Sequence, residues 1–442
     1  MISVAESSRV PLPEEDNPYL KKFGFQGRCV APAPPRDLGM VVVIPCHDEP
    51  DLIGSLEALR ACAPPDCQVE CIVVVNDAEN ATDETRRRNL ETLTAVNHWR
   101  QFNDTSSLRF HIIESLGQPA KRAGVGLARK IGMDEAVRRL DLSGNGDRGV
   151  IVCFDADCRC DNNYLREIER HFREHPGSPG CSIYFEHSLE QAPDRRQDAI
   201  VSYELHLRYY IDALRLAGFP RAYQTVGSSM AVRSWAYQKQ GGMNLRQAGE
   251  DFYFLHRIIE LGGFTELLST RVLPSPRPSH RVPFGTGRAV AQMLEQKEAR
   301  FTTYPFQSFL DLRQLLPLAT SLRLMSEEEA GALMASLPSP LRKFLDAQRF
   351  ASELIRMRNE TTQAGTYFRR FFSWFNAFRV MKCVHHARDA CYGSEPVAAA
   401  AAQLLRELDI LEPRAPAPTE RELLETFRSH DREGWQDPPS CP

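Results

Sequence analysis

The sequence has 442 residues, of which 54 are Lys or Arg and 58 are Asp or Glu, so its formal net charge is −4. This balance lacks the basic excess of nucleic-acid-binding proteins, and no apolar run reaches the ~18 residues of a membrane span. With 42% hydrophobic and 25% charged residues, the composition is that of a soluble globular protein large enough for two or three domains of about 150 residues.

The first 38 residues are polar and end in the Pro-rich stretch APAPPRD, which predicts an N-terminal arm or linker over 1–38. No basic start followed by an apolar segment is present, so we expect no secretory signal and a cytoplasmic protein. The 12 cysteines show no zinc-type pairing, and reduced, mostly buried thiols are the expectation.

From residue 39 onward, short β-branched runs alternate with segments of helical periodicity. The predicted strands are Met40–Pro45, Val69–Asp77, Leu108–Ser115 and Gly149–Asp157, and the intervening helices start near Leu52, where Asp51 can act as the cap, near Thr82 and near Gly126. Such alternation predicts an α/β fold with a mostly parallel sheet, whose ligands bind beyond the carboxyl ends of the strands.

Polar residues follow three of these strands directly. The first strand runs into His47, Asp48 and Glu49, the second ends at Asn76 and Asp77, and the fourth ends at Asp155 and Asp157. We therefore expect three acidic clusters to converge on one edge of the sheet. Carboxylates one residue apart can hold a hard cation such as Mg²⁺ or Mn²⁺, although a solvated turn or a helix cap explains Asp155 and Asp157 equally well.

Beyond Ala289 the periodicity is helical, which predicts a helical domain over 289–412 followed by a Pro-rich tail over 413–442. The segment Tyr367–His386 combines many aromatic residues with basic ones. A buried helix is the favoured interpretation, and peripheral contact with the inner face of a membrane is the alternative. The helical region is expected to shape an acceptor pocket or a contact between copies of the chain.

Five segments, in this order, resemble glycosyltransferase family 2: VVVIPCHDEPDLIGSLEAL, VVVNDAENATDE, AGVGLARKIGMDEA, VCFDADC and GSSMAVRSWAYQKQGGMNLRQAGEDFYFLHRI. The resemblance spans Met40–Arg288. It implies a GT-A fold over 39–288, with a Rossmann-like, mostly parallel sheet flanked by helices. It also implies a metal-dependent, inverting transferase of hexosyltransferase type, which moves a sugar from a nucleotide diphosphate sugar to the hydroxyl of a saccharide, a lipid-linked acceptor or a small molecule.

The resemblance also assigns residues. Several residues are expected to bind the nucleotide sugar: Pro45 and Glu49 lie beside the nucleotide, and Asp77 contacts the nucleobase. Lys121, Gly124 and Arg129 are expected near phosphate or ribose, and Asp155 at the ribose or a metal-bound water. Arg281 and Arg288 are expected over the diphosphate. Asn76 stands where the family usually has a second aspartate, so the nucleobase that the donor site prefers is left open.

The remaining assignments concern the metal ligands and the general base of catalysis. Asp157, with Asp155, is expected to hold Mn²⁺ or Mg²⁺, and His280 is the candidate third ligand. Asp251 is expected to take the proton of the acceptor hydroxyl, with Glu250 as the second candidate.

Two other functions remain open at this point. A sugar-phosphate nucleotidyltransferase also combines an α/β sheet with paired aspartates, but the acidic loop PCHDEPD is poorly suited to clasp a triphosphate. A non-catalytic GT-A-like scaffold is the second alternative, against which the complete set of carboxylates argues.

Overall fold

The computed structural model describes residues 17–25, 30–189, 194–278, 285–295, 301–413, 416 and 418–435. Contacts group the chain into two compact units. Unit 1 contains the described residues within Met1–Phe185 and Thr225–Pro274, and unit 2 contains those within Glu186–Gln224 and Ser275–Pro442.

Unit 1 is built on an eight-stranded sheet of order β3-β2-β1-β4-β7-β6-β8-β5. The strands are β1 (Leu38–Cys46), β2 (Gln68–Ala78), β3 (Leu108–Gln118), β4 (Val150–Cys153), β5 (Arg159–Cys160), β6 (Gly180–Phe185), β7 (Met230–Arg233) and β8 (Thr265–Leu273). The four strands β3, β2, β1 and β4 are parallel, whereas β7 runs antiparallel to both β4 and β6. The sheet is therefore mixed and mostly parallel in its N-terminal half.

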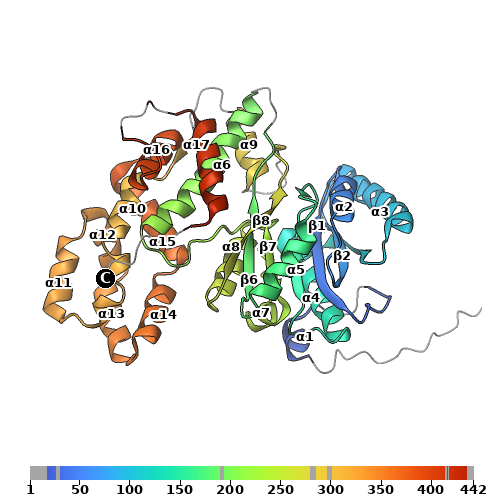
Figure 1. The fold of residues 1–442 in the computed structure, drawn as a ribbon, viewed down its shortest axis with the longest axis horizontal. Coiled ribbons are helices and arrows are strands. Elements are labelled where there is room, and N and C mark those ends of the chain that lie inside the picture. The colour runs from blue at the N-terminus through green and yellow to red at the C-terminus, as the bar shows by residue number, and fades with distance from the viewer. Residues whose placement is uncertain are drawn as a thin grey trace, which may run out of the picture. The chain divides into compact units, whose positions relative to one another are not determined.

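Helices flank this sheet (Figure 1). They are α1 (Pro18–Phe23), α2 (Leu52–Arg60), α3 (Asp83–Asn103), α4 (Val125–Leu142), α5 (Tyr164–Glu174), α7 (Ser234–Lys239) and α8 (Glu250–Ile259). The central helix α4 packs on β1 and β2, and Gly132 permits the close approach, because an added Cβ would lie 2.4 Å from Cγ1 of Val43. The predicted α/β architecture is confirmed.

Two local predictions for unit 1 need correction. The predicted strand Gly149–Asp157 is shorter, because β4 ends at Cys153 and a turn follows in which the amide of Cys158 donates to the carbonyl of Asp155 at 3.1 Å. Asp51 makes no side-chain cap on α2, because its carboxylate pairs with Arg159 at 2.6 Å instead.

Unit 2 is mainly helical. Its α-helices are α6 (Arg195–Leu216), α9 (Thr286–Glu295), α10 (Phe306–Arg313), α11 (Glu327–Ser336), α12 (Ser339–Ala347), α13 (Phe350–Asn359), α14 (Ala364–Trp374), α15 (Ala377–Ala387), α16 (Val397–Glu407) and α17 (Glu420–Glu433). Short elements are the 3₁₀ turns η2 (Leu316–Leu318) and η3 (Ser321–Arg323), the π-turn η4 (Arg388–Tyr392) and the paired strands β9 (Thr302–Thr303) and β10 (Glu395–Pro396).

A buried ionic network joins α6 to the last helix, α17, which lies beside it (Figure 1). The fully buried carboxylate of Glu204 accepts hydrogen bonds from Arg208, Arg428 and the ring of His187, at 2.7 to 2.9 Å. Because α6 packs with α9, α16 and α17, its contacts place it in unit 2 although it lies within the range 39–288. The predicted domain limits remain predictions.

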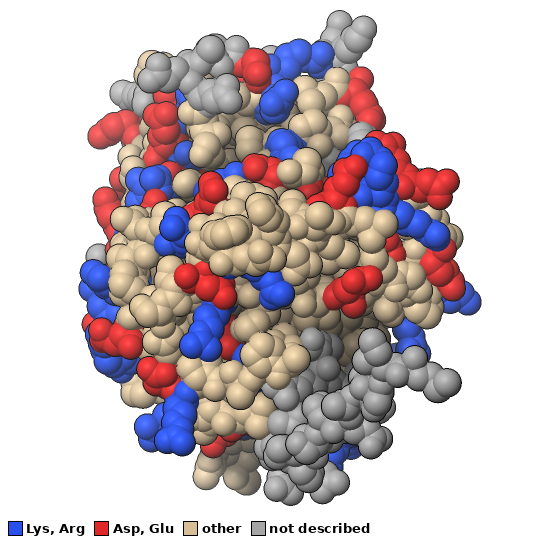
Figure 2. Space-filling view, turned by 90° about the vertical axis from the view of Figure 1, so that its right-hand side faces the viewer, with Lys and Arg blue, Asp and Glu red and all other residues tan. Residues whose placement is uncertain are grey.

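The aromatic segment Tyr367–His386 forms two helices, because α14 ends at Trp374 and Asn376 caps α15 by accepting a hydrogen bond from the amide of Arg379. Most of its aromatic rings are buried, whereas Phe368 and Phe378 are about one third exposed, at 37% and 36%. In the described part of the chain no helix is long and apolar enough to cross a membrane. Figure 2 shows Lys and Arg interspersed with Asp and Glu on the face in view, without a region of one sign.

Candidate active site

The ends of β1 and β2 are joined by polar contacts. The ring Nδ1 of His47 lies 2.8 Å from the carbonyl oxygen of Asn76, and the amide of Asp48 donates to Oδ1 of Asn89, on α3, at 2.9 Å. Glu49 is buried and accepts a hydrogen bond from the amide of Asp51 at 2.8 Å. The half-buried Pro45 is the last residue but one of β1, and the loop that follows this strand is held against the end of the second strand.

Asp77 is fixed from two sides. Its Oδ1 accepts a hydrogen bond from the amide of Gly117, at the end of β3, at 2.6 Å, and its Oδ2 accepts one from Asn89 at 3.2 Å. Asp77 is 2% exposed, so this carboxylate is oriented by the protein itself. Sequence reasoning missed Asn89, although its position on the apolar face of the helix, one turn before Leu93, marks it as a buried polar residue.

The start of α4 lies against the loop that precedes α8. The side chain of Asn76 donates to the carbonyl of Gly124 at 3.2 Å. A Cβ on Gly124 would lie 3.1 Å from Cα of Gln247, and one on Gly126 would lie 2.3 Å from the carbonyl oxygen of Arg246, so both positions require glycine-sized residues. Lys121 is exposed in the turn before this helix.

Arg129, on α4, connects two carboxylates that come from distant parts of the sequence. Its Nη2 lies 2.6 Å from Oδ1 of Asp155, in the turn after β4, and its Nη1 pairs with Oε1 of Glu250, the first residue of α8. The side chains of Arg129 and Glu250 are both 3% exposed, whereas that of Asp155 is 36% exposed. The guanidinium of Arg129 thus binds two protein carboxylates, and its assignment to phosphate or ribose stays a prediction.

Gly227 makes this arrangement sterically possible. A Cβ at this position would lie 2.6 Å from both terminal nitrogens of Arg129. The guanidinium therefore fills the space that any larger residue would occupy.

The electrostatics of this cluster favour protonation of the α8 carboxylates. Burial raises the pKa of Glu250 to about 7, with Arg129 opposing the shift and Asp251 adding to it. Burial also raises the pKa of Asp251, while Arg129 and the backbone amides of Phe252 and Gly227 counteract this effect. One guanidinium thus faces the three carboxylates of Asp155, Glu250 and Asp251. Together with burial, this excess of negative charge raises the pKa values of the α8 carboxylates toward neutral pH, which suits proton transfer.

The residues expected to hold a metal are only partly described. Asp157 is half-buried, in the same turn as Asp155, and His280 and Arg281 lie outside the described residues. No group of three potential ligands is found where the structure is described. Carboxylate oxygens nevertheless suit Mg²⁺ or Mn²⁺, which commonly take their other ligands from substrate phosphates and water. Arg288 is half-buried on α9 of unit 2.

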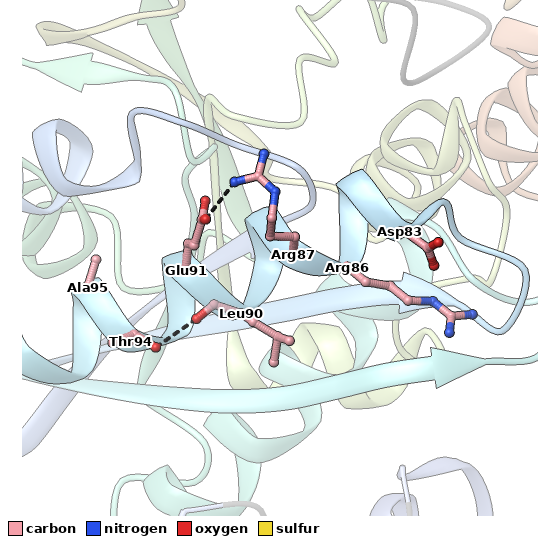
Figure 3. Close-up of a pocket in the computed structure, with 7 residues that line it drawn as sticks. All are labelled: Asp83, Arg86, Arg87, Leu90, Glu91, Thr94 and Ala95. Carbon is pink, nitrogen blue, oxygen red and sulfur yellow. Dashed lines mark hydrogen bonds and ion pairs between the residues drawn. The ribbon is translucent and has the colours of Figure 1, made fainter.

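A surface pocket of about 620 Å³ lies on α3, away from the candidate site residues described above. It is lined by Asp83, Arg86, Arg87, Leu90, Glu91, Thr94 and Ala95. Figure 3 shows Arg87 turned toward Glu91, with which it pairs at 2.6 Å. None of the residues predicted from the sequence lines this pocket, so it is not the candidate site.

Neither the comparison with protein-family models nor the comparison with curated proteins gives a match. Solved structures similar to this chain include TarS 1-349 from S. aureus in complex with UDP-GlcNAc, with 14% identity over 73% of this chain and 90% of that one, and a TM-score of 0.40. The mannosyltransferase PcManGT from Pyrobaculum calidifontis, in complex with GDP-Man and Mn²⁺, has 15% identity over 94% of this chain and 92% of that one, and a TM-score of 0.33.

Proposed function

We propose that this protein is a glycosyltransferase that moves a sugar from a nucleotide diphosphate sugar to an acceptor hydroxyl. The observation that carries the proposal is the contact of Arg129 with both Asp155 and Glu250. It brings the FDAD turn and the GED helix start into one cluster at the carboxyl end of the parallel strands, where ligands of α/β sheets bind. The order of motifs that resembles family 2 supports the same reaction.

In this proposal Asp251 is the general base. It takes the proton of the acceptor hydroxyl while that oxygen attacks the anomeric carbon, and the bond from that carbon to the diphosphate oxygen breaks, which inverts the configuration. Glu250 is bound to Arg129, so its carboxylate is less available for proton transfer and serves to position the guanidinium. Burial near other carboxylates keeps Asp251 more basic than an exposed aspartate.

The donor would lie along the strand ends. Glu49 and Asp77 would border the nucleotide, and Arg129 holds Asp155 in place at the sugar end of the site. Asp157 and Asp155 would hold Mn²⁺ or Mg²⁺, which supplies positive charge to stabilise the departing diphosphate. Lys121 and Gly124, at the entrance to α4, would face the phosphates.

Thermal denaturation tests the donor site. UDP, GDP, TDP and CMP and their sugars are each added with and without Mn²⁺, because a ligand that binds only the native state raises the melting temperature. We expect a metal-dependent rise with one class of diphosphate, absent in Asp157→Ala and retained in Glu91→Gln, an exposed control on α3. A folded protein that responds to no nucleotide sugar would contradict the proposal, and release of pyrophosphate from a nucleoside triphosphate would identify a nucleotidyltransferase instead.

A further inference from the structure

Two cysteines of unit 1 lie side by side. Cys62 follows α2, and Cys160 is the second residue of β5, 98 positions along the chain. Their Sγ atoms are 3.7 Å apart, and both residues are half-buried. The thiols are in contact but not bonded, since the sulfurs of a disulfide are about 2.05 Å apart.

The backbone around the two cysteines is already held together. The amide of Ala63 donates to the carbonyl of Asn162 at 2.7 Å, so the residue after Cys62 is hydrogen-bonded to the second residue after Cys160. At the other end of α2, Arg159 pairs with Asp51 at 2.6 Å. A bond between the sulfurs therefore needs a small movement of side chains and no rearrangement of the fold.

We propose that Cys62 and Cys160 are a redox pair that a peroxide converts into a reversible disulfide. The thiolate of Cys62 attacks one peroxide oxygen, the O–O bond breaks, and a sulfenic acid and hydroxide form. Cys160 then attacks the oxidised sulfur, the S–O bond breaks, and the hydroxyl leaves as water with the proton of Cys160. The two sulfurs lose two electrons, and the peroxide is reduced to two waters.

The surroundings assign the order of attack. The hydrogen bond with Cys160 lowers the pKa of Cys62, whereas the same contact and burial raise the pKa of Cys160. Cys62 is then the thiol that reacts first, because the thiolate is the nucleophile. The buried Cys153 is a poor nucleophile by comparison, because burial raises its pKa to about 12. Cys391, which is exposed and belongs to unit 2, is not part of this pair.

The disulfide would stiffen the turn that carries Asp155 and Asp157. The hydroxyl of Ser55, on α2, donates to the carbonyl of Ala156 in that turn at 2.8 Å. A disulfide between Cys62 and Cys160 would attach the turn to the segment after α2 at a second point, just after the turn ends. Any effect on donor binding rests on the proposed function, but formation of the disulfide does not.

Peptide mapping of the full-length protein tests the pair. The reduced protein is treated with hydrogen peroxide, free thiols are alkylated, and the chain is cleaved without reduction. Trypsin places Cys160 on a peptide with no other cysteine, since it cuts after Arg159 and Arg166, and cleavage at Asp66 separates Cys62 from Cys67. We expect the Cys62 and Cys160 peptides to be linked, the link to be reversed by a dithiol, and amide exchange over 155–160 to slow while it is present.

Matched variants give the controls. Cys62→Ser should abolish the link and leave Cys160 open to alkylation, whereas Cys67→Ser, at another half-buried cysteine, should leave the link intact. The proposal is overturned if Cys160 of the wild-type protein stays fully alkylated under peroxide that oxidises Cys391, or if Cys160 links equally well to another cysteine in Cys62→Ser. Absence of nucleotide-sugar binding would change neither result.

Discussion

Nη2 of Arg129 lies 2.6 Å from Oδ1 of Asp155, while Nη1 of the same side chain binds Glu250. A helix, a turn after a strand and the first residue of another helix are thereby joined by one buried guanidinium. The planar, forked geometry of arginine suits this double contact, and lysine cannot reproduce it.

Replacing Arg129 should therefore strongly destabilise unit 1. Arg129→Met leaves the buried Glu250 without its cation, and losing one partner of a buried pair costs about 3–5 kcal/mol. The free energy of unfolding in urea measures this loss. The control is Arg87→Ala, whose pair with Glu91 is 62% and 59% exposed and for which we expect about 0–1 kcal/mol. Equal, small losses in both variants would show that the buried pair does not hold the site together.

Gly227→Ala should disturb the same contact from the opposite side. The added Cβ would lie 2.6 Å from the nitrogens of Arg129, so the guanidinium must move, at a cost of about 1–3 kcal/mol for overpacking. Gly331→Ala is the matched control, because nothing lies within 4 Å of an added Cβ there and alanine favours the helix α11. Urea denaturation should show a loss in the first variant and a small gain in the second, and a gain in both would contradict the observed packing.

Asp251→Asn tests the general base. The amide cannot accept the acceptor proton, and losing a general base lowers the rate about 10²–10⁴-fold. The melting temperature should change little, because asparagine has nearly the size and shape of aspartate and Glu250 keeps its contact with Arg129. Turnover of the donor with its acceptor is the readout, once the donor class is known. Wild-type turnover in a folded Asp251→Asn protein would exclude this residue as the base.

Glu250 should make stability depend on pH. Burial raises its pKa to about 7, so between its ordinary value of about 4.5 and pH 7 the native state holds a proton that the unfolded chain has released. This contribution to stability is fully present below pH 4.5 and is lost as the pH rises through 7.

Glu250→Gln removes that titration. The difference in the free energy of unfolding between wild type and Glu250→Gln should therefore fall as the pH rises from 5 to about 8. Urea titrations of both proteins at each pH measure it. A difference that grows with pH would mean that the ion pair with Arg129 outweighs burial, with the pKa of Glu250 lowered instead of raised.

The parallel core of unit 1 can be predicted from local hydrophobic patterns alone. Uninterrupted β-branched runs such as Val41–Ile44 can be satisfied only by burial on both faces of a strand, and the polar residues that follow them must then lie at the carboxyl edge. The positions of Asp77 and Asp155 are predictable in this way, because local hydrophobic patterning encodes where a buried strand ends.

Which residues meet at that edge, and which groups they bind, depends on how the helices and strands pack together. Asn89 holds Asp77, and Arg129 binds Asp155 and Glu250, because side chains from distant segments meet only when the helices pack on the sheet. The antiparallel entry of β7 and the packing of α6 within unit 2 also depend on long-range contacts. The hydrophobic pattern of one segment carries no information about these long-range contacts, because they depend on which other helices and strands pack against its apolar face.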